Sequence, residues 1–323
     1  MKLKLDLTMV AILASLALGL LLPLEGGAAD VLDIVTKVAI FLLFFGYGAR
    51  LSTEETVAGI RHWKLHLTIL AITFVMYPLL AVPLLPVPEG LLSEPIKIGL
   101  IFLCLVPSTV QSSITFTSLA GGNIPAAMVS ATASNVLGVV ITPLLTVLFI
   151  QSSSGGSIGM QQIYNVMVQL LLPFILGQLS RFITAGFMAR HRTGLKYVDQ
   201  GVIVLIVYGA FSDLRASGAW RTLGWVDVAW VLPVTMGLLA FTFWFTWRLA
   251  GRLGFNRPDS IAIMFCGTKK SLATGVPMAM VLFPTATVGV VVIPLMLYHQ
   301  VQLLVSSVLA NRLGRHRQED SHA

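Results

Sequence analysis

The sequence predicts an all-α polytopic membrane protein with ten transmembrane helices, arranged as two inverted five-helix repeats. Three observations support this fold class. Hydrophobic residues make up 56% of the 323 residues and charged residues only 11%, whereas soluble domains carry about 25% charged residues. Basic residues are concentrated in alternate loops. One apolar segment in each half of the chain contains a polar interruption.

Ten apolar segments are candidates for crossing a bilayer, which takes about 20 residues in a helix. A cleaved signal peptide is the alternative for the first of them, but its removal would leave an odd number of spans. The expected spans cover residues 8–24, 31–50, 65–86, 96–118, 123–150, 161–182, 197–213, 226–250, 260–282 and 286–311.

The loops between these segments alternate in charge. Because cytoplasmic loops are enriched in Lys and Arg, the pattern places both termini on the cytoplasmic side of a bacterial-type cytoplasmic membrane. The net charge of +7 then reflects topology, and no nucleic-acid partner is expected. The expected cytoplasmic loops hold 15 of the 21 Lys and Arg: Lys2, Lys4, Arg50, Arg61, Lys64, Arg181, Arg190, Arg192, Lys196, Arg248, Arg252, Arg257, Arg312, Arg315 and Arg317.

The ninth segment carries two adjacent lysines, Lys269 and Lys270, between glycines and hydroxyl residues. A lysine at the centre of a lipid-facing helix costs about 2.5–3.5 kcal/mol on insertion scales. Non-helical polar backbone at this depth is tolerated only where it is buried in protein or lines a wet cavity. We therefore expect a helix that is broken near the lysines and faces an interior site, with Thr268 and Ser271 beside it.

The fourth segment is interrupted in a similar way. Pro107 lacks an amide donor and disrupts a helix, and Gln111, Ser112 and Ser113 follow it. Because each half has an odd number of spans, the two halves enter the membrane from opposite sides. The expected inverted repeats are residues 1–150 and 151–323, and together they form one transporter domain, 1–312. Interrupted spans at matching positions of inverted repeats indicate a transporter binding site.

The fifth segment adds Thr132, Ser134 and Asn135, at spacings that bring hydroxyl and amide groups to shared helix faces. The Gly121–Gly122 turn before it would return the chain beside the fourth segment. Thr132 and Asn135 are candidates for the same site, or for hydrogen bonds between helices, which are common in membranes.

Two interpretations of the lysines remain open at this stage. One ammonium could replace a coupling cation, pair with an anionic substrate or release a proton during transport; the alternative is a structural charge held by helix-end carbonyls. Which of the two faces a cavity is undecided, because adjacent helical positions point about 100° apart. Gln111, Ser112 and Ser113 either line the site or cap the half-helix after Pro107.

The chain resembles the bile acid:sodium symporter superfamily, and within it the SBF-like branch. The resemblance rests on the motifs FLLFFGYGARLS at 41–52, HWKLH at 62–66, AGGN at 120–123 and GTKKSLATGVP at 267–277. It implies ten helices in a core and a panel domain, with helices four and nine broken and crossing. It also implies alternating-access transport of an organic anion.

The branch departs from the better-known members of the superfamily at the expected sodium sites. Those members carry an acidic residue where this chain has Phe265, and Gln-Asn where it has Lys269 and Lys270. The carboxylate ligand for sodium is therefore missing. The oxygen atoms that the resemblance leaves for a possible sodium ion belong to Ser113, Thr132 and Ser134.

The sequence thus predicts a secondary active transporter, a symporter of a small organic anion coupled to sodium or protons. The alternatives are a sodium-independent uniporter or exchanger, in which a buried lysine replaces the cation, and a non-transporting membrane sensor. We expect no enzyme activity, because the chain lacks the usual hydrolase and metalloprotease motifs. No cofactor is expected apart from the possible sodium ion.

Overall fold

The computed structural model describes residues 7–50, 62–88, 90–154 and 160–320. Lys2, Lys4 and Arg61, which contribute to the expected loop charges, lie outside these residues. Every regular element in the described ranges is helical. In chain order the elements are α1 (Leu7–Leu21), α2 (Gly27–Arg50), α4 (Trp63–Ala71), η2 (Ile72–Met76), α5 (Tyr77–Ala81), η3 (Val82–Leu84), α6 (Glu94–Leu105), α7 (Gln111–Leu119), α8 (Ile124–Ser154), α9 (Met160–Leu179), α10 (Arg181–Arg190), α11 (Arg192–Ala216), η4 (Ala219–Thr222), α12 (Trp225–Arg252), α13 (Arg257–Thr268), α14 (Leu272–Leu282), α15 (Thr285–Val291) and α16 (Ile293–Asp320).

Each of the ten predicted apolar segments is helical in the structure, but they do not all qualify as uninterrupted spans. Among the described residues, the helical stretches long and apolar enough to cross a membrane are 63–84, 124–149, 192–216, 225–252 and 285–315. Residues 168–179 and 181–190 form a further pair bent by 87°. The chain is therefore an all-helical polytopic membrane protein, while the ten-span topology and the inverted repeats stay predictions.

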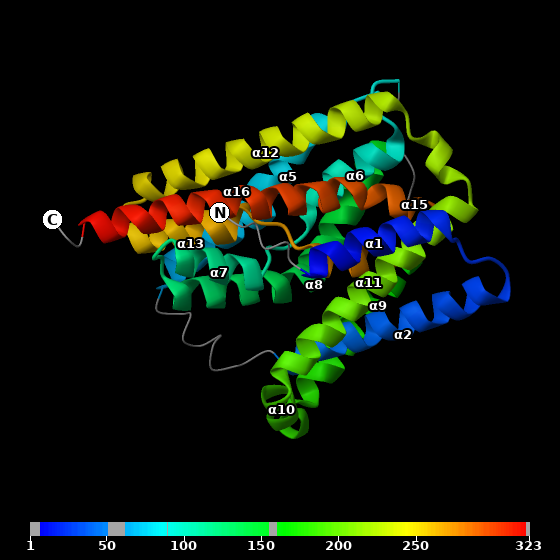
Figure 1. The fold of residues 1–323 in the computed structure, drawn as a ribbon, viewed down its shortest axis with the longest axis horizontal. Helices are drawn as coiled ribbons and strands as arrows, with labels where there is room; N and C mark the ends of the chain where they lie inside the picture. The colour runs from blue at the N-terminus through cyan, green and yellow to red at the C-terminus, as the bar shows by residue number, and fades with distance from the viewer. Residues whose placement is uncertain (1–6, 51–61, 89, 155–159, 321–323) are drawn as a thin grey trace.

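One helix was not expected. The basic residues at 181–196 predict a cytoplasmic loop over residues 183–196, but Arg181–Arg190 form α10. This helix is polar at both ends and carries Phe182, which is 85% exposed, and Figure 1 places it at the edge of the molecule.

The helices pack in two groups (Figure 1). In the first, α2 packs against α9 and α1 against α11; in the second, α12 packs against α13 and α16, and α7 against α8 and α13. The backbones of α2 and α9 approach each other closely. A Cβ added at Gly48 would clash with the Phe174 carbonyl oxygen, and one at Gly177 would clash with that of Phe45. Only glycine permits this approach of two backbones.

The turn between α7 and α8 fixes where α13 begins. Gly121 has a positive φ of 74°, a conformation that glycine adopts without strain. Asn123 then accepts a hydrogen bond from the Ala126 amide at 3.1 Å, which caps α8, and donates one to Asp259 at 2.7 Å. Because Asp259 lies in the first turn of α13, this turn positions the end of α7 beside the start of α13.

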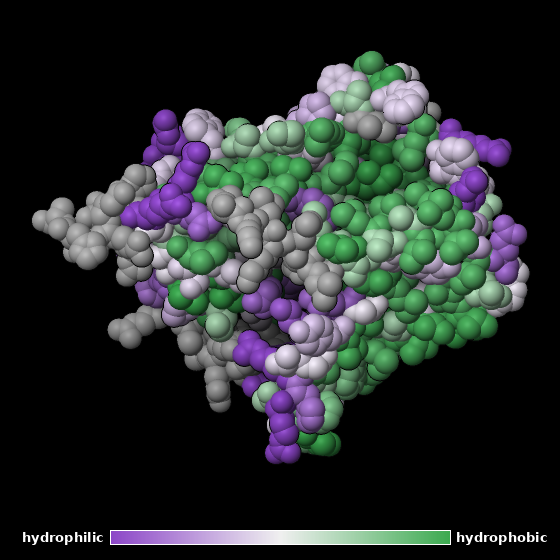
Figure 2. Space-filling model, in the orientation of Figure 1, coloured by the Kyte–Doolittle hydropathy of each residue, from purple (hydrophilic) through white to green (hydrophobic). Residues whose placement is uncertain are grey.

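The surface agrees with a lipid environment. Figure 2 shows apolar side chains over much of one face, with hydrophilic side chains gathered toward its ends. Trp225, for example, is 90% exposed. An exposed apolar surface of this extent indicates a membrane or a partner rather than water.

Candidate functional site

The first helix break separates α6 from α7. Val106 has extended backbone angles, with φ −73° and ψ 153°, and α7 does not begin until Gln111. Pro107 explains the break, because it lacks an amide donor and disfavours helical geometry in the residue before it. The predicted interruption of the fourth segment is thus present in the structure.

The second break separates α13 from α14, at Lys269, Lys270 and Ser271. Lys269 is extended, with φ −90° and ψ 147°. Ser271 caps α14 by accepting a hydrogen bond from the Thr274 amide at 3.2 Å. This cap supplies a partner for one of the amides that a helix start leaves unpaired.

The two breaks contact each other directly. The Ser271 amide donates to the Pro107 carbonyl at 2.8 Å. Toward α13, the Ser108 hydroxyl donates to the Cys266 carbonyl at 2.6 Å, and the Ser113 hydroxyl donates to the Phe265 carbonyl at 3.3 Å. Each break therefore supplies partners for backbone groups that the other break leaves without helical hydrogen bonds.

The α8 side chains join both breaks. Asn135 donates to the Ser108 carbonyl at 2.6 Å and accepts from the Thr274 hydroxyl at 2.6 Å. Ser134 accepts from the Ser108 amide at 3.1 Å. Thr132 is partly exposed, and its hydroxyl has no hydrogen-bond partner among the described residues.

Lys270 is 0% exposed, and carbonyl oxygens surround its ammonium group. Nζ donates to the carbonyl oxygens of Val106 at 2.9 Å, Cys104 at 3.0 Å and Thr73 at 3.3 Å. It also lies 3.9 Å from the centroid of the Tyr77 ring. Cys104 and Val106 end the half-helix α6, where carbonyl groups lack amide partners and the helix dipole is negative.

The third carbonyl comes from an irregular helix. Thr73 lies in η2, a five-residue π-helical segment within the stretch 63–84. A π-helical turn departs from the usual hydrogen-bond pattern, and such turns are frequent at functional sites. Here the irregular turn places a carbonyl oxygen within hydrogen-bond distance of Lys270.

Lys269 is also 0% exposed, but its surroundings differ. Its ammonium donates to the Ser306 hydroxyl at 2.8 Å and lies 4.2 Å from the centroid of the Phe116 ring. The Phe265 ring lies 5.7 Å away. The ion pairs found among the described residues involve neither Lys269 nor Lys270.

Gln302 holds the backbone of the second break. Its side-chain oxygen accepts from the Lys270 amide at 2.8 Å, and its side-chain nitrogen donates to the Lys270 carbonyl at 2.8 Å. Tyr77 and Tyr298 each donate to the Thr268 carbonyl at 2.7 Å. The Thr268 carbonyl and both backbone groups of Lys270 thereby have hydrogen-bond partners.

Sequence reasoning missed several residues that contact the breaks. The polar pair Gln302 and Ser306, four residues apart in an apolar helix, was a signal that could have been used, because such spacing places both on one face. No local pattern marked the contribution of Thr73. The residues missed are Thr73, Tyr77, Tyr298, Gln302 and Ser306.

The predicted site residues other than Thr132 lie in the breaks, adjoin them or hydrogen-bond to them, but they differ in accessibility. Gln111 is exposed, and Ser112, Thr132 and Asn135 are partly exposed. The others are buried: Ser113, Ser134, Thr268, Lys269, Lys270 and Ser271. Figure 2 shows a hollow edged by hydrophilic side chains in the region between α7 and α10.

The oxygen set proposed for sodium is not assembled as a free ligand shell. The Ser134 hydroxyl accepts from a backbone amide, and the Ser113 hydroxyl bonds to the Phe265 carbonyl and lies 3.1 Å from the Thr109 hydroxyl. Sodium binding at Ser113, Thr132 and Ser134 stays a prediction.

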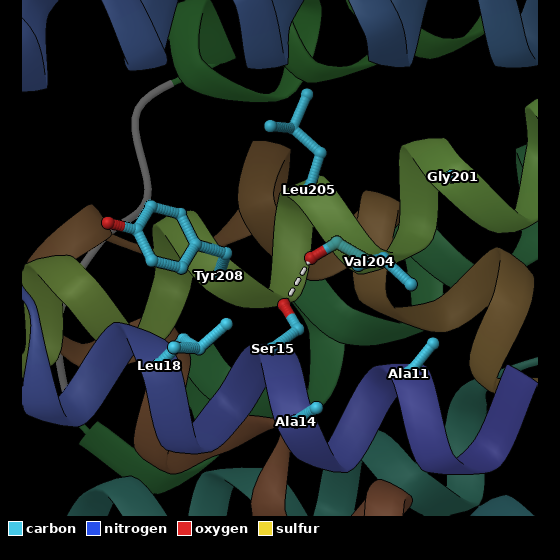
Figure 3. A pocket seen from close by; sticks show the side chains of 8 residues that line it. All are labelled: Ala11, Ala14, Ser15, Leu18, Gly201, Val204, Leu205 and Tyr208. Carbon is cyan, nitrogen blue, oxygen red and sulfur yellow. Dashed lines mark hydrogen bonds between the residues drawn. The ribbon is translucent and has the colours of Figure 1, made fainter.

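A groove of about 390 Å³ lies elsewhere, between α1 and α11 (Figure 3). Ser15 crosses between the two helices and donates to the Val204 carbonyl at 2.5 Å. The other lining side chains are apolar apart from Tyr208, and none of the predicted site residues lines this groove.

An all-helical membrane protein with two facing helix breaks around buried charges belongs to the class of polytopic membrane transporters. The comparisons with known proteins narrow this class. A model of the SBF-like CPA transporter family matches residues 6–315, and the chain belongs to this family.

Three relatives illustrate the similarity. "Uncharacterized protein PA2026" of Pseudomonas aeruginosa is 46% identical over 97% of this chain and 94% of its own length. "Putative symporter YfeH" of Escherichia coli K12 is 42% identical over 92% of this chain and 89% of its own. "Sodium/bile acid cotransporter 7" of Danio rerio is 31% identical over 88% of this chain and 85% of its own. The chain is therefore an integral membrane transporter for a small-molecule substrate.

Proposed function

We propose that this protein is a secondary active transporter that moves a small organic anion across the cytoplasmic membrane by alternating access. The observation that carries the proposal is the contact between the two breaks, with exposed Gln111 and partly exposed Asn135 beside it. Broken helices near the middle of a membrane protein typically form the substrate site of a transporter.

The start of α7 is the part of this site best suited to an anion. The first amides of a helix lack intrahelical partners, and the helix dipole there is positive. Gln111 and Ser112 stand at this end and remain accessible, whereas both lysine ammonium groups are sealed by protein. In this proposal the anion contacts the amide end of α7. The buried lysines do not touch the anion, and their positive charges make the local electrostatic potential more positive.

The proposed topology comprises ten crossings in two inverted repeats, 1–150 and 151–323, with both termini cytoplasmic. The two packing groups would then correspond to panel and core domains. Polar breaks contributed by both repeats would lie at the centre, as the repeat symmetry requires.

Coupling has two candidate forms, through sodium or protons, or without a coupling cation. The ligands of the Lys270 ammonium favour the second form. Three carbonyl oxygens at 2.9–3.3 Å are groups that also bind monovalent metal ions. We propose that this ammonium takes the place of a coupling cation, so that the protein works as a sodium-independent exchanger, in which the gradient of one substrate drives the transport of another.

Transport in proteoliposomes tests the proposal. The probes are radiolabelled monocarboxylates, dicarboxylates, an alkyl sulfonate and a bile acid, each with and without a sodium gradient. We expect saturable uptake or counterflow of at least one probe, unchanged by sodium. Lys270→Ala should abolish this flux or make it depend on sodium. Lys97, buried outside the breaks with its ammonium 3.4 Å from the Val87 carbonyl, provides the control variant Lys97→Ala.

The outcomes separate the rival forms. Uptake that requires a sodium gradient in the unmodified protein would refute the fixed-cation form and favour coupling to sodium. Uptake driven by a proton gradient alone would favour coupling to protons. Specific binding of probes with no flux under any gradient would contradict transport and favour a sensor.

A further inference from the structure

A second groove lies away from the breaks, where the end of α11 meets η4 and the start of α12. Its volume is about 550 Å³, within the range typical of sites for small molecules. Its lining is largely apolar, with Leu16, Leu20, Phe211, Leu214, Leu223 and Ile293.

The groove has a cationic end. Arg215 lines it, with its guanidinium 4.9 Å from the Trp220 ring centroid, and Arg221 lies 5.8 Å from the same ring. Neither arginine forms an ion pair within the described ranges. The nearby carboxylate of Asp227 is engaged, because it accepts the amides of Ser93 at 2.7 Å and Gly224 at 2.9 Å. Neither guanidinium is therefore held by a carboxylate, and both are available to an anionic ligand.

Two tryptophans place this end at the membrane surface. Trp220 and the 90% exposed Trp225 both line the groove, and tryptophan is enriched at the interface between lipid and water. The site thus combines an apolar channel at membrane depth with a guanidinium at headgroup depth.

We propose that this groove binds an anionic phospholipid of the surrounding bilayer. One acyl chain lies along the leucines and Phe211, and the phosphate contacts the guanidinium of Arg215. Arginine is well suited to phosphate, because its planar donors can form two hydrogen bonds at once. The groove in Figure 3 offers an internal contrast, since Ala11, Leu18 and Tyr208 line it without any cation.

Native mass spectrometry of the purified full chain tests the proposal. The protein is exchanged into detergent with equal amounts of phosphatidylglycerol and phosphatidylcholine that carry the same acyl chains. The unmodified protein should retain phosphatidylglycerol preferentially. Arg215→Gln should lower the ratio of retained phosphatidylglycerol to phosphatidylcholine by about fivefold, as expected for one cationic side chain near an anionic headgroup.

The matched control is Arg248→Gln, because the Arg248 guanidinium lies 5.8 Å from the Trp244 ring at the other end of α12 and lines neither groove. It should leave the ratio within about twofold. Leu20→Trp fills the groove and should lower retention of phosphatidylglycerol while the melting temperature is kept. Equal retention of both lipids by the unmodified protein, or an unchanged ratio in Arg215→Gln, would overturn the proposal. A dimer that Leu20→Trp dissociates, without lipid adducts, would overturn it as well.

Discussion

Replacing each adjacent lysine by methionine should have very different effects on stability. Methionine keeps the length of the side chain and removes its charge. In Lys270→Met, the carbonyl oxygens of Cys104 and Val106 lose an ammonium donor at 3.0 and 2.9 Å. Both carbonyls end α6, so no amide of that helix can replace the donor.

The magnitude follows from these two acceptors. A buried polar group left without a partner costs about 1–3 kcal/mol. Part of this destabilisation is offset, because the variant no longer has to bury a charged ammonium away from water. We expect Lys270→Met to lower the free energy of unfolding by about 3 kcal/mol, which corresponds to a fall in Tm of about 4 °C for a chain of this size.

Lys269→Met should be close to neutral. The Lys269 ammonium has one hydrogen bond, to the Ser306 hydroxyl, which can bond a carbonyl of its own helix instead. The contact with the Phe116 ring, 4.2 Å from the ammonium, is replaced by a sulfur–aromatic contact of about 0.3–1.5 kcal/mol. We expect a change in Tm of less than about 2 °C.

Thermal unfolding in detergent, followed by tryptophan fluorescence, measures both variants, since the chain has six tryptophans. Scan rate and lipid content must be the same for all samples, because unfolding of large proteins is often irreversible. The reasoning is refuted if the two variants lose the same stability, or if Lys269→Met is the more damaged of the two.

Three further substitutions follow from the same contacts. Gly177→Ala should abolish folded protein or lower Tm strongly, because the added Cβ would overlap the Phe45 carbonyl. Gly186→Ala, with open space around the added Cβ, should express normally. Size-exclusion chromatography of both variants tests this difference. Asn135→Ala should reduce transport more than tenfold and lower stability by about 1–3 kcal/mol, because it removes the bridge between the breaks; normal flux would contradict this. Gln302→Glu should lower Tm by several degrees, as a carboxylate cannot donate to the Lys270 carbonyl, and an unchanged melting curve would show that this bond contributes little.

The sequence alone could locate both breaks, because their causes are local. Pro107 disrupts a helix wherever it stands in the interior, and paired lysines within an apolar segment require a protein-lined environment. The contact of Ser113 with the second break also followed from matching the two halves of the chain, and that of Asn135 from the turn that returns α8 beside α7.

The partners of the lysines could not be predicted in this way. Thr73 lies 197 positions before Lys270, and its carbonyl is offered by a π-helical turn that no residue type marks. Gln302 holds Lys270 across 32 positions. The different partners of the two neighbouring lysines likewise depend on the tertiary structure, because each ammonium contacts different helices. The helix at Arg181–Arg190 was not predicted, because its apolar stretch is short and the arginines at both ends suggested a loop.

The hydrogen bonds across the breaks also constrain how the molecule can move. Direct bonds at 2.6–3.0 Å join the breaks through Ser108 and Cys266, through Ser271 and Pro107, and through Lys270 to the end of α6. Separating the breaks would leave all of these buried groups unpaired at once, at about 1–3 kcal/mol each. By contrast, among the described residues α2 bonds to α14 through one long hydrogen bond, from the Tyr47 hydroxyl to the Ala273 carbonyl at 3.4 Å. We infer that the breaks stay together during transport as one rigid unit. If access alternates as proposed, the movement would take place between this unit and the group formed by α1, α2, α9 and α11.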